Sequence, residues 1–503
     1  MPTNLANTAP IDQNDLQFDA LLSNLQGNIL KGHGRDHTAN IFVEFDPARL
    51  AEAREWIHLF TDEHVTSAKR QLKENERFKR NGVPGGLFAG VYVTALGCEF
   101  FKVAKGKKPG DASFQGGMEK AKLNDPLRAK WDAPFRELNI HLMILLGHDD
   151  KLELSLATAA VVKELRPLTV NDEFVSEGIL IEYGNAIRNA NGDGLEHFGY
   201  VDGVSQPLFF QDENAKFEAN ATPSTPGGLH WTPFAPLKQV LVADPLVAVE
   251  DACGSYFVFR KLEQDVLGFK RAEKDVAKKL GLEGEEEELA GALVVGRYED
   301  GTPVTLLPVD GLIGSGAANN FNYDADLLGL KCPFQAHIRK SNPRGTGGQP
   351  EEEGGQKKEP RILPPDEVLA LEKSRIMARR GIPFGQREVT PAIEAEPEQF
   401  PSGGGVGLLF MSFQASLADQ FEFIQKQWVN NATFPKGVTP AHTGIDPLIG
   451  QSAATPDPKD REYEWPAHYD QAGPTVKKEF ASFITMKGGE YFFAPSLDGL
   501  RAL

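Results

Sequence analysis

Short apolar runs of strand length recur along the whole chain, and this recurrence restricts the possible folds more than any other feature. A first set comprises residues 41–45, 89–96, 139–146 and 178–184. A second set comprises residues 255–265, 291–298, 405–414 and 489–495. Runs of four to eight residues that are rich in Val, Ile, Phe and Tyr and lie between polar or Gly-containing segments are typical of β-strands.

Helical stretches lie between these runs, at residues 48–78, 151–165 and from Ala415 to about Trp428. Two rounds of strand, helix and strand with long insertions predict an α+β architecture, with antiparallel sheets and peripheral helices. A chain of 503 residues exceeds the usual size of one core, so we expect two domains. The predicted division is a tail at 1–20, an N-terminal domain at 21–220, a Pro-rich linker at 221–240 and a C-terminal domain at 241–503.

The composition excludes several classes of function. The net charge of −18 disfavours nucleic acid and anionic membranes as partners. No apolar run is long enough to span a bilayer, and residues 1–15 lack the basic and apolar segments of a secretory signal. The three widely separated cysteines form neither a disulfide framework nor a zinc cluster. Nucleotide-binding and common hydrolase motifs are also missing from the sequence.

Three polar segments are candidates for a functional site. EHFGYVDGVSQP, residues 196–207, places Asp202 between two glycines, although Asp-Gly is also an ordinary turn. CPFQAHIRKSNPR, residues 332–344, contains His337 followed by cationic residues in an otherwise acidic chain. A single histidine is often structural, but cations close to it would suit an axial haem ligand, because haem carries two propionates. RIMARRGIPFG, residues 375–385, is either a basic helix end or a source of permanent charge.

Together these segments resemble those of the dye-decolorizing peroxidases, a family of haem peroxidases. GYVDGVSQP is similar to the family's Gly-x-x-Asp-Gly signature, HIRKSNPR to its ligand histidine, and ARRGIPFG to its distal arginine. GVGLLFMSFQ is similar to the apolar wall of its pocket. The four motifs occur in the family's order between residues 199 and 414, and the length and insertions are most similar to the fungal members.

On the distal side of the haem, the resemblance implies that Asp202 is the acid–base that moves the peroxide proton. Arg379, which lies four residues before Pro383, would stabilise charge beside it. Leu408 and Phe410 would line the distal pocket. The glycines around Asp202 would let the backbone approach the porphyrin closely.

On the proximal side, the resemblance implies that His337 binds the iron and that Arg339 binds a propionate. Asp446 would hydrogen-bond the imidazole and strengthen its donation to the metal. His197, beside the signature motif, is the nearest rival to His337 as a ligand.

Trp428 has two interpretations. It continues an apolar stripe at helical spacing with Leu417, Phe421 and Ile424, which predicts a core position. It also lies at the end of the predicted helix. At this position the resemblance places a surface-oxidisable Trp in several fungal members. Because Phe384 stands where some members have Tyr, Trp428 would be the leading site of electron transfer.

The resemblance implies two ferredoxin-like domains with one haem b between them. It also implies oxidation of bulky dyes and phenols by hydrogen peroxide in one-electron steps, by a secreted monomer or homodimer that binds no membrane and no nucleic acid. Haem-dependent cleavage of alkenes such as carotenoids, manganese oxidation, and a non-catalytic haem protein remain alternatives. The least specific alternative is an acidic interaction protein without a cofactor.

Overall fold

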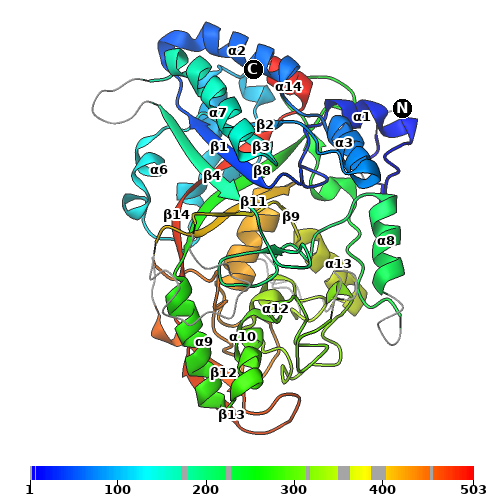
Figure 1. Ribbon diagram of the computed structural model, residues 1–503, viewed down its shortest axis with the longest axis vertical. Helices are drawn as coiled ribbons and strands as arrows, with labels where there is room; N and C mark the ends of the chain where they lie inside the picture. Colours follow the sequence, from blue (N-terminus) through cyan, green and yellow to red (C-terminus); the bar gives the residue numbers. More distant parts are fainter. Residues whose placement is uncertain are drawn as a thin grey trace, which may run out of the picture.

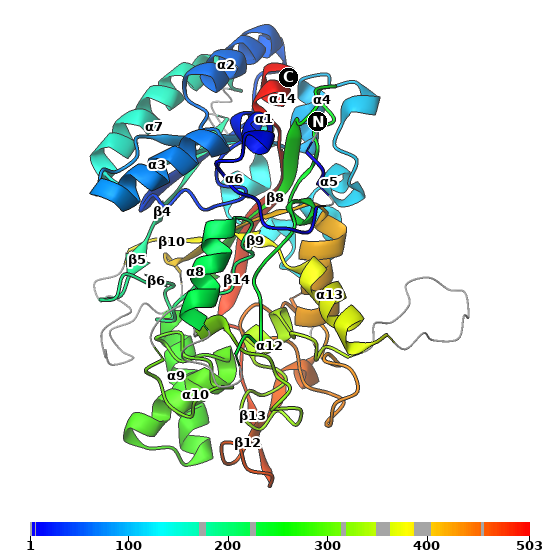
Figure 2. The same ribbon diagram turned by 90° about the vertical axis from the view of Figure 1, so that its right-hand side faces the viewer.

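Two four-stranded units with the same strand order form the centre of the molecule (Figure 1). The computed structural model describes residues 3–5, 7–170, 178–221, 228–312, 318–348, 363–386, 404–453 and 457–503. In Figure 1, α2 and α7 lie at one end of the molecule and α9 and α10 at the other, with the strands of the two units between them. Figure 2 shows both chain termini at the end that carries α2.

The first unit has the strand order β2-β3-β1-β4, with antiparallel neighbours. This is the order of the split βαβ, or ferredoxin-like, arrangement. Its strands are β1 (His37–Val43), β2 (Phe88–Val93), β3 (Leu142–His148) and β4 (Ile179–Asn185). Its helices are α1 (Asp19–Asn24), α2 (Leu50–Glu63), α3 (Ala68–Asn81), α4 (Ala95–Phe100), α5 (Ala112–Gly116), α6 (Ala133–Glu137) and α7 (Lys151–Leu165).

The second unit repeats this order as β10-β11-β8-β14. Its strands are β8 (Cys253–Gln264), β10 (Ile382–Phe384), β11 (Gly407–Gln414) and β14 (Ile484–Ala494), with β7 (Val242–Ala243) and β9 (Ala378–Arg379) as short additions. Its helices are α9 (Val266–Leu280), α10 (Glu288–Val295), α12 (His337–Ser341), α13 (Pro365–Arg375) and α14 (Leu497–Arg501). Two π-helical segments, η10 (Leu417–Glu422) and η11 (Ile424–Val429), precede β14.

Aromatic side chains join the two units into one core. The ring centroids of Phe42 on β1 and Phe259 on β8 are 4.8 Å apart, and those of Tyr92 on β2 and Phe257 on β8 are 4.5 Å apart. The sheets also meet at an edge, where β14 pairs with β2 through Phe493. One face of each sheet therefore packs against the other sheet.

Helix α7 shows how local sequence determines an element. Asp150 caps its first turn by accepting hydrogen bonds from two backbone N–H groups. Its buried residues are Leu154, Thr158, Val161 and Leu165, which recur at helical spacing and pack the helix onto β1 and β3.

The structure confirms the α+β class with two ferredoxin-like units and corrects three local predictions. Residues 291–298 were expected to form a strand, but they belong mostly to α10, a helix buried on all sides, for which an apolar run gives no periodic signal. The helical stretch 48–78 is two helices, because Ser67 caps a new helix after a break. The stretch from Ala415 is π-helical rather than α-helical.

The second unit carries several additions. They are helix α8 (Gln211–Ala221), the ribbon of β5 (Ile187–Arg188) and β6 (Gly194–Leu195), and the ribbon of β12 (Glu462–Pro466) and β13 (Thr475–Glu479). Of the predicted linker, residues 222–227 lie outside the described part, and the domain limits stay a prediction. No helix within the described residues has the length and apolar character needed to cross a membrane.

Candidate active site

The free face of the second sheet forms one wall of a large cavity. Side chains alternate between the faces of a strand, so β8 presents Arg260, Leu262 and Gln264 to the cavity, and β11 presents Leu408 and Phe410. The intervening residues of these strands face the aromatic core between the sheets, among them Phe257, Phe259 and Phe413. The alternation of side chains along these strands thus separates the site from the core.

Long connections supply the other walls of the cavity. The segment 196–205 crosses from the first unit, while α12 and the segments around η10 and η11 belong to the second. The cavity contains about 1620 Å³ of space, including the solvent at its mouth. Its walls are mostly apolar with a few charged side chains, which is typical of sites that hold a cofactor.

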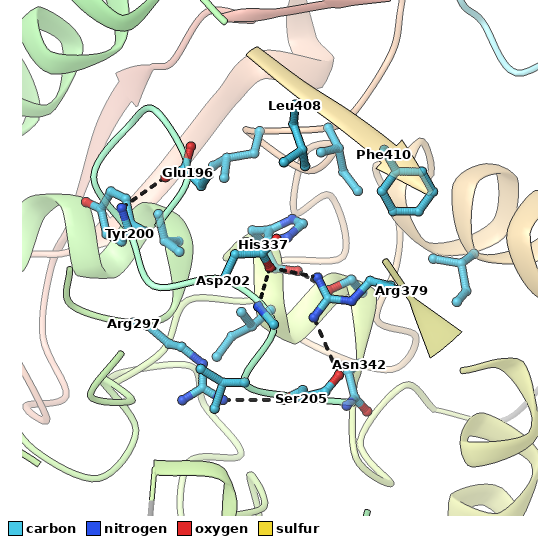
Figure 3. Close-up of a pocket in the computed structure, with 18 of the residues that line it drawn as sticks. Glu196, Tyr200, Asp202, Ser205, Arg297, His337, Asn342, Arg379, Leu408 and Phe410 are labelled. Carbon is cyan, nitrogen blue, oxygen red and sulfur yellow. Dashed lines mark hydrogen bonds and ion pairs between the residues drawn. The ribbon is translucent and has the colours of Figure 1, made fainter. Parts of the chain in front are cut away.

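Asp202 and Arg379 form an ion pair inside this cavity (Figure 3). Asp202 Oδ1 and Arg379 Nη1 are 3.1 Å apart. The backbone N–H of Arg379 donates to the side chain of Gln206, and its Nη2 donates to the carbonyl of Ser205. Two motifs that are 177 residues apart in sequence therefore present one acid and one permanent cation together.

The glycine after Asp202 is required by backbone conformation. Gly203 has φ +81°, in the left-handed region that glycine adopts without strain. A Cβ at this position would meet no atom closer than 4.0 Å, so no clash with another protein atom excludes a larger residue here. The tight turn lets the backbone N–H of Gly203 donate to Asp202 Oδ1, which holds the carboxylate in place.

His337 lies on α12 and lines the same cavity as Asp202 and Arg379 (Figure 3). Its Nδ1 is 2.8 Å from Oδ2 of Asp446, which is fully buried. The other carboxylate oxygen of Asp446 accepts the backbone N–H groups of Leu448 and Ile449. Since Asp446 occupies Nδ1, Nε2 is the nitrogen left for a metal in the cavity.

The surroundings of His337 act on its pKa in opposite directions. Burial lowers the pKa of the imidazole, but the Asp446 carboxylate more than compensates, so that the pKa is raised above its usual value. The same contact that would orient a metal ligand therefore favours positive charge on the imidazole when no metal is bound.

The structure does not bring Arg339 to the cavity, contrary to its expected role at a propionate. Arg339 is buried and pairs with Asp326, with 2.9 Å between Nη1 and Oδ2. It also donates to the carbonyls of Cys332 and Asp326, and its guanidinium stacks over Tyr323. Alternate positions on a helix point in different directions, so a residue two places after His337 faces the scaffold that supports α12.

Besides Arg379 and Arg260 of β8, two more arginines line the cavity, and the motif argument did not assign them a role. Arg344 donates to the backbone carbonyls of Asn319 and Phe321. Arg297 donates to those of Gly301 and Ala318. For Arg344 the only sequence signal was the cationic character of residues 339–344, and for Arg297 there was none. These guanidinium groups bring positive charge to the cavity wall, which suits the propionates of a haem.

The chemistry of the residues that line the cavity fits a haem. Among the described residues, no group of three or more His, Cys, Asp or Glu could hold a metal ion directly. A porphyrin supplies four nitrogen ligands itself and needs a single axial ligand such as His337. The apolar side chains of Leu408 and Phe410 and the nearby arginines match the macrocycle and its carboxylates.

Comparison with known proteins places the chain in a family. No protein-family model matches it. It is 42% identical to the multifunctional dye peroxidase DyP2 of Amycolatopsis over the full length of both chains. It is 30% identical to a dye-decolorizing peroxidase of Auricularia auricula-judae, covering 95% of this chain and 85% of the relative. The chain belongs to the dye-decolorizing peroxidase family.

Solved structures agree with this assignment. The structure of DyP2 from Amycolatopsis superposes with a TM-score of 0.85 at 38% identity, covering 99% of each chain. That of a DyP-type peroxidase from Anabaena superposes with a TM-score of 0.83 at 36% identity, covering 99% of this chain and 98% of the other. The expected similarity to fungal members in particular is not confirmed, because the identity to the Auricularia enzyme is lower than that to the bacterial one.

Glu196 is a further ionisable residue of the dye-decolorizing peroxidase cavity, and the motif argument passed over it. Its carboxylate accepts the backbone N–H groups of Phe198 and Tyr200 and the side-chain amide of Gln264. Burial raises the pKa of Glu196 to about 7, against these hydrogen bonds, which lower it. Its place in the signature segment, six residues before Asp202, was the only signal in the sequence.

His197, the rival of His337, and Arg380, the residue that follows Arg379, both lie elsewhere. His197 is buried and its Nε2 lies 2.8 Å from the carbonyl oxygen of Phe384, outside the residues that line the cavity. Arg380 donates to the backbone carbonyls of Asn28 and Ile29 in the first unit. The geometry therefore favours His337 and Arg379 over these neighbours.

Trp428 is a core residue in this structure. Its side chain is 4% exposed, and its ring stacks on Phe434 with centroids 5.5 Å apart and meets Phe423 edge-on. The expectation that its indole is partly exposed to solvent is wrong, because the ring packs between Phe423 and Phe434. A role in electron transfer then requires a route through the surrounding rings.

Proposed function

We propose that this protein holds one haem b in the cavity and uses hydrogen peroxide to oxidise bulky dyes and phenols by single-electron steps. His337 would hold the iron through Nε2, and Arg297 and Arg344 would balance the propionates. When bound, the haem supplies an iron that binds peroxide and accepts its oxidising equivalents. The names of the relatives support this activity.

The distal residues would move the peroxide proton. Splitting the O–O bond requires a group that takes a proton from the near oxygen and delivers it to the far oxygen. A carboxylate can do so, and Asp202 is the carboxylate that pairs with Arg379 in the cavity. Arg379 keeps its charge throughout and would stabilise the negative charge that develops beside it.

The proximal residues would hold and polarise the metal ligand. Asp446 accepts a hydrogen bond from Nδ1 of His337. This bond would give the imidazole more anionic character and so increase its electron donation to the iron. The backbone N–H groups that bind Asp446 keep this carboxylate oriented.

One observation carries the proposal: the Asp202–Arg379 pair shares a cavity with a histidine whose Nδ1 is already bound by a buried carboxylate. The test is a visible spectrum of the purified protein before and after one equivalent of peroxide. We expect a Soret band that changes within the mixing time and returns when a phenol is added. A spectrum without a Soret band, or one that peroxide leaves unchanged, would contradict the proposal.

A non-catalytic haem protein has no need of the Asp202–Arg379 pair, and the relatives' names do not favour alkene cleavage. The proposal extends to an extracellular location and to a monomer or homodimer, which rest on the family resemblance alone. Size-exclusion chromatography with light scattering would decide the oligomeric state.

A further inference from the structure

Trp231 and Trp428 both lie close to the cavity, and their electrostatic surroundings differ. Trp231 is 7% exposed and lines a small second cavity that shares Ser205 and Asn342 with the main one. Trp428 follows Ile424 and Gln425, which line the main cavity. An oxidising centre in the cavity would therefore have two indoles within reach.

Cations lie against the ring of Trp231. The guanidinium carbon of Arg344 is 4.5 Å from the ring centroid, and Lys373 Nζ is 5.4 Å from it. Arg344 itself lines the main cavity, so a single side chain separates the indole from the site of oxidation. Within the described residues, Lys373 has no carboxylate partner that would offset its charge.

Cations near Trp428 stack instead on the neighbouring phenyl rings. The guanidinium carbon of Arg375 is 4.0 Å from the ring centroid of Phe423, and Lys340 Nζ is 5.9 Å from that of Phe434. For the part of the chain that the structure describes, no cation lies over the Trp428 indole.

This difference affects how readily each indole loses an electron. Removal of one electron leaves a radical cation, and a positive charge about 5 Å away opposes that step by Coulomb repulsion. Cations over a neutral ring also stabilise the reduced form through the ring quadrupole. Both effects make Trp231 harder to oxidise than an indole without such neighbours.

We propose that Arg344 and Lys373 protect Trp231 from oxidation and so direct oxidising equivalents to other electron donors. This inference rests on the proposed peroxidase function. It assigns to Lys373, which does not line the main cavity, a part in deciding where the protein is oxidised.

The chemistry to be measured is self-oxidation in the absence of a reducing substrate. The indole gives up two electrons and one C–H hydrogen, and hydrogen peroxide is reduced as its O–O bond breaks. One oxygen atom replaces the hydrogen as a hydroxyl group on the ring, and the other leaves as water. The balance is Trp plus hydrogen peroxide giving hydroxytryptophan plus water.

The experiment compares the wild-type holoprotein with Lys373→Met and Lys373→Arg. Each is treated with peroxide alone at about pH 5, where a lysine ammonium is charged even though burial lowers the pKa of Lys373. Peptide mapping by mass spectrometry then quantifies hydroxylation at Trp231 and Trp428, while peroxide consumption is followed in the same tubes.

We expect hydroxylation of Trp231 to rise about tenfold in Lys373→Met, which corresponds to about 1.4 kcal/mol. Lys373→Arg keeps the charge and should behave as wild type, and Trp428 should change little in either variant. If peroxide is consumed and Trp231 hydroxylation is equal in all three proteins, the protective role is wrong while the proposed function stands. If peroxide is not consumed by wild type, both are wrong.

Discussion

The two ferredoxin-like units share a strand order but use the outer face of the sheet differently. In the first unit α7 packs on β1 and β3, and the strands are buried on both faces apart from edge strand β4. In the second unit the corresponding face carries the lining residues of β8 and β11, and a cavity replaces the covering helix.

The difference arises from the connections rather than from the strands. In the first unit, β1 leads into β2 through two helices and β3 leads into β4 through one. In the second, the connection from β8 to β9 contains His337, and the connection from β11 to β14 contains Asp446 and Trp428. The same topology can therefore fill its outer face with a helix or leave it open for a cofactor when the crossovers are lengthened.

The largest expected effect is loss of haem from the second unit. His337→Ala should lose most bound haem, because the iron–imidazole bond anchors the cofactor. His197→Gln, in which the amide can still reach the carbonyl of Phe384, should keep it. The ratio of Soret to protein absorbance measures both. If His337→Ala keeps its full haem content and an unchanged spectrum, His337 is not the iron ligand and the second unit does not anchor the cofactor through it.

The next effect is on the rate of reaction with peroxide. Asp202→Asn and Arg379→Leu should each fold and bind haem, yet slow the reaction about tenfold or far more, as is usual for loss of an acid–base or a charge stabiliser. Asp193→Asn, an exposed change in the same connection, should not slow it. Stopped-flow absorbance gives the rates, and unchanged rates in both cavity variants would rule out the distal pair.

A smaller effect concerns the exit of electrons from the second unit. Trp428→Phe should keep the packing against Phe423 and Phe434 and retain oxidation of small phenols, but lose most activity on bulky dyes. Trp428→Ser should in addition lower the stability by about 3–5 kcal/mol, because it empties a buried site. If Trp428→Phe oxidises dyes as fast as wild type, Trp428 is a core residue only.

The smallest effect is on the pH dependence of stability. The pKa of Glu196 is raised to about 7 in the folded protein, so the folded state binds more protons than the unfolded state between its ordinary value and pH 7. The contribution of Glu196 to the free energy of unfolding is fully present at lower pH. It is lost as the pH rises through about 7, which lowers the stability by about 1–3 kcal/mol. Urea unfolding at pH 5 and pH 8 measures how much the free energy of unfolding falls between these two pH values. We expect a smaller fall in Glu196→Gln than in wild type.

The control for this measurement lies in the first unit. Glu55→Gln on the exposed side of α2 should leave the decrease between the two pH values unchanged. An equal decrease in Glu196→Gln and wild type would mean that other groups carry the pH dependence. Glu288 and Glu372 are the nearest alternatives, since burial also raises their pKa values to about 7.

Most strands could be predicted from the sequence because their apolar runs have strand length and lie between polar segments. The same criterion failed at residues 291–298, where a helix is buried on all sides and no polar face reveals its period. It also missed the break before α3, because Ser67 interrupts a stretch whose charges suit a helix on either side.

By itself, the sequence determined the residue types of the site and their local placement: a carboxylate on a glycine turn, a histidine among cations, and an arginine before Gly-Ile-Pro. Only the tertiary structure decided which side chains reach the cavity. It excluded Arg339, whose charge is balanced by Asp326, and brought in Arg344 and Glu196. The physical reason is that the direction of a side chain depends on the position of its backbone among distant segments, which local sequence does not specify.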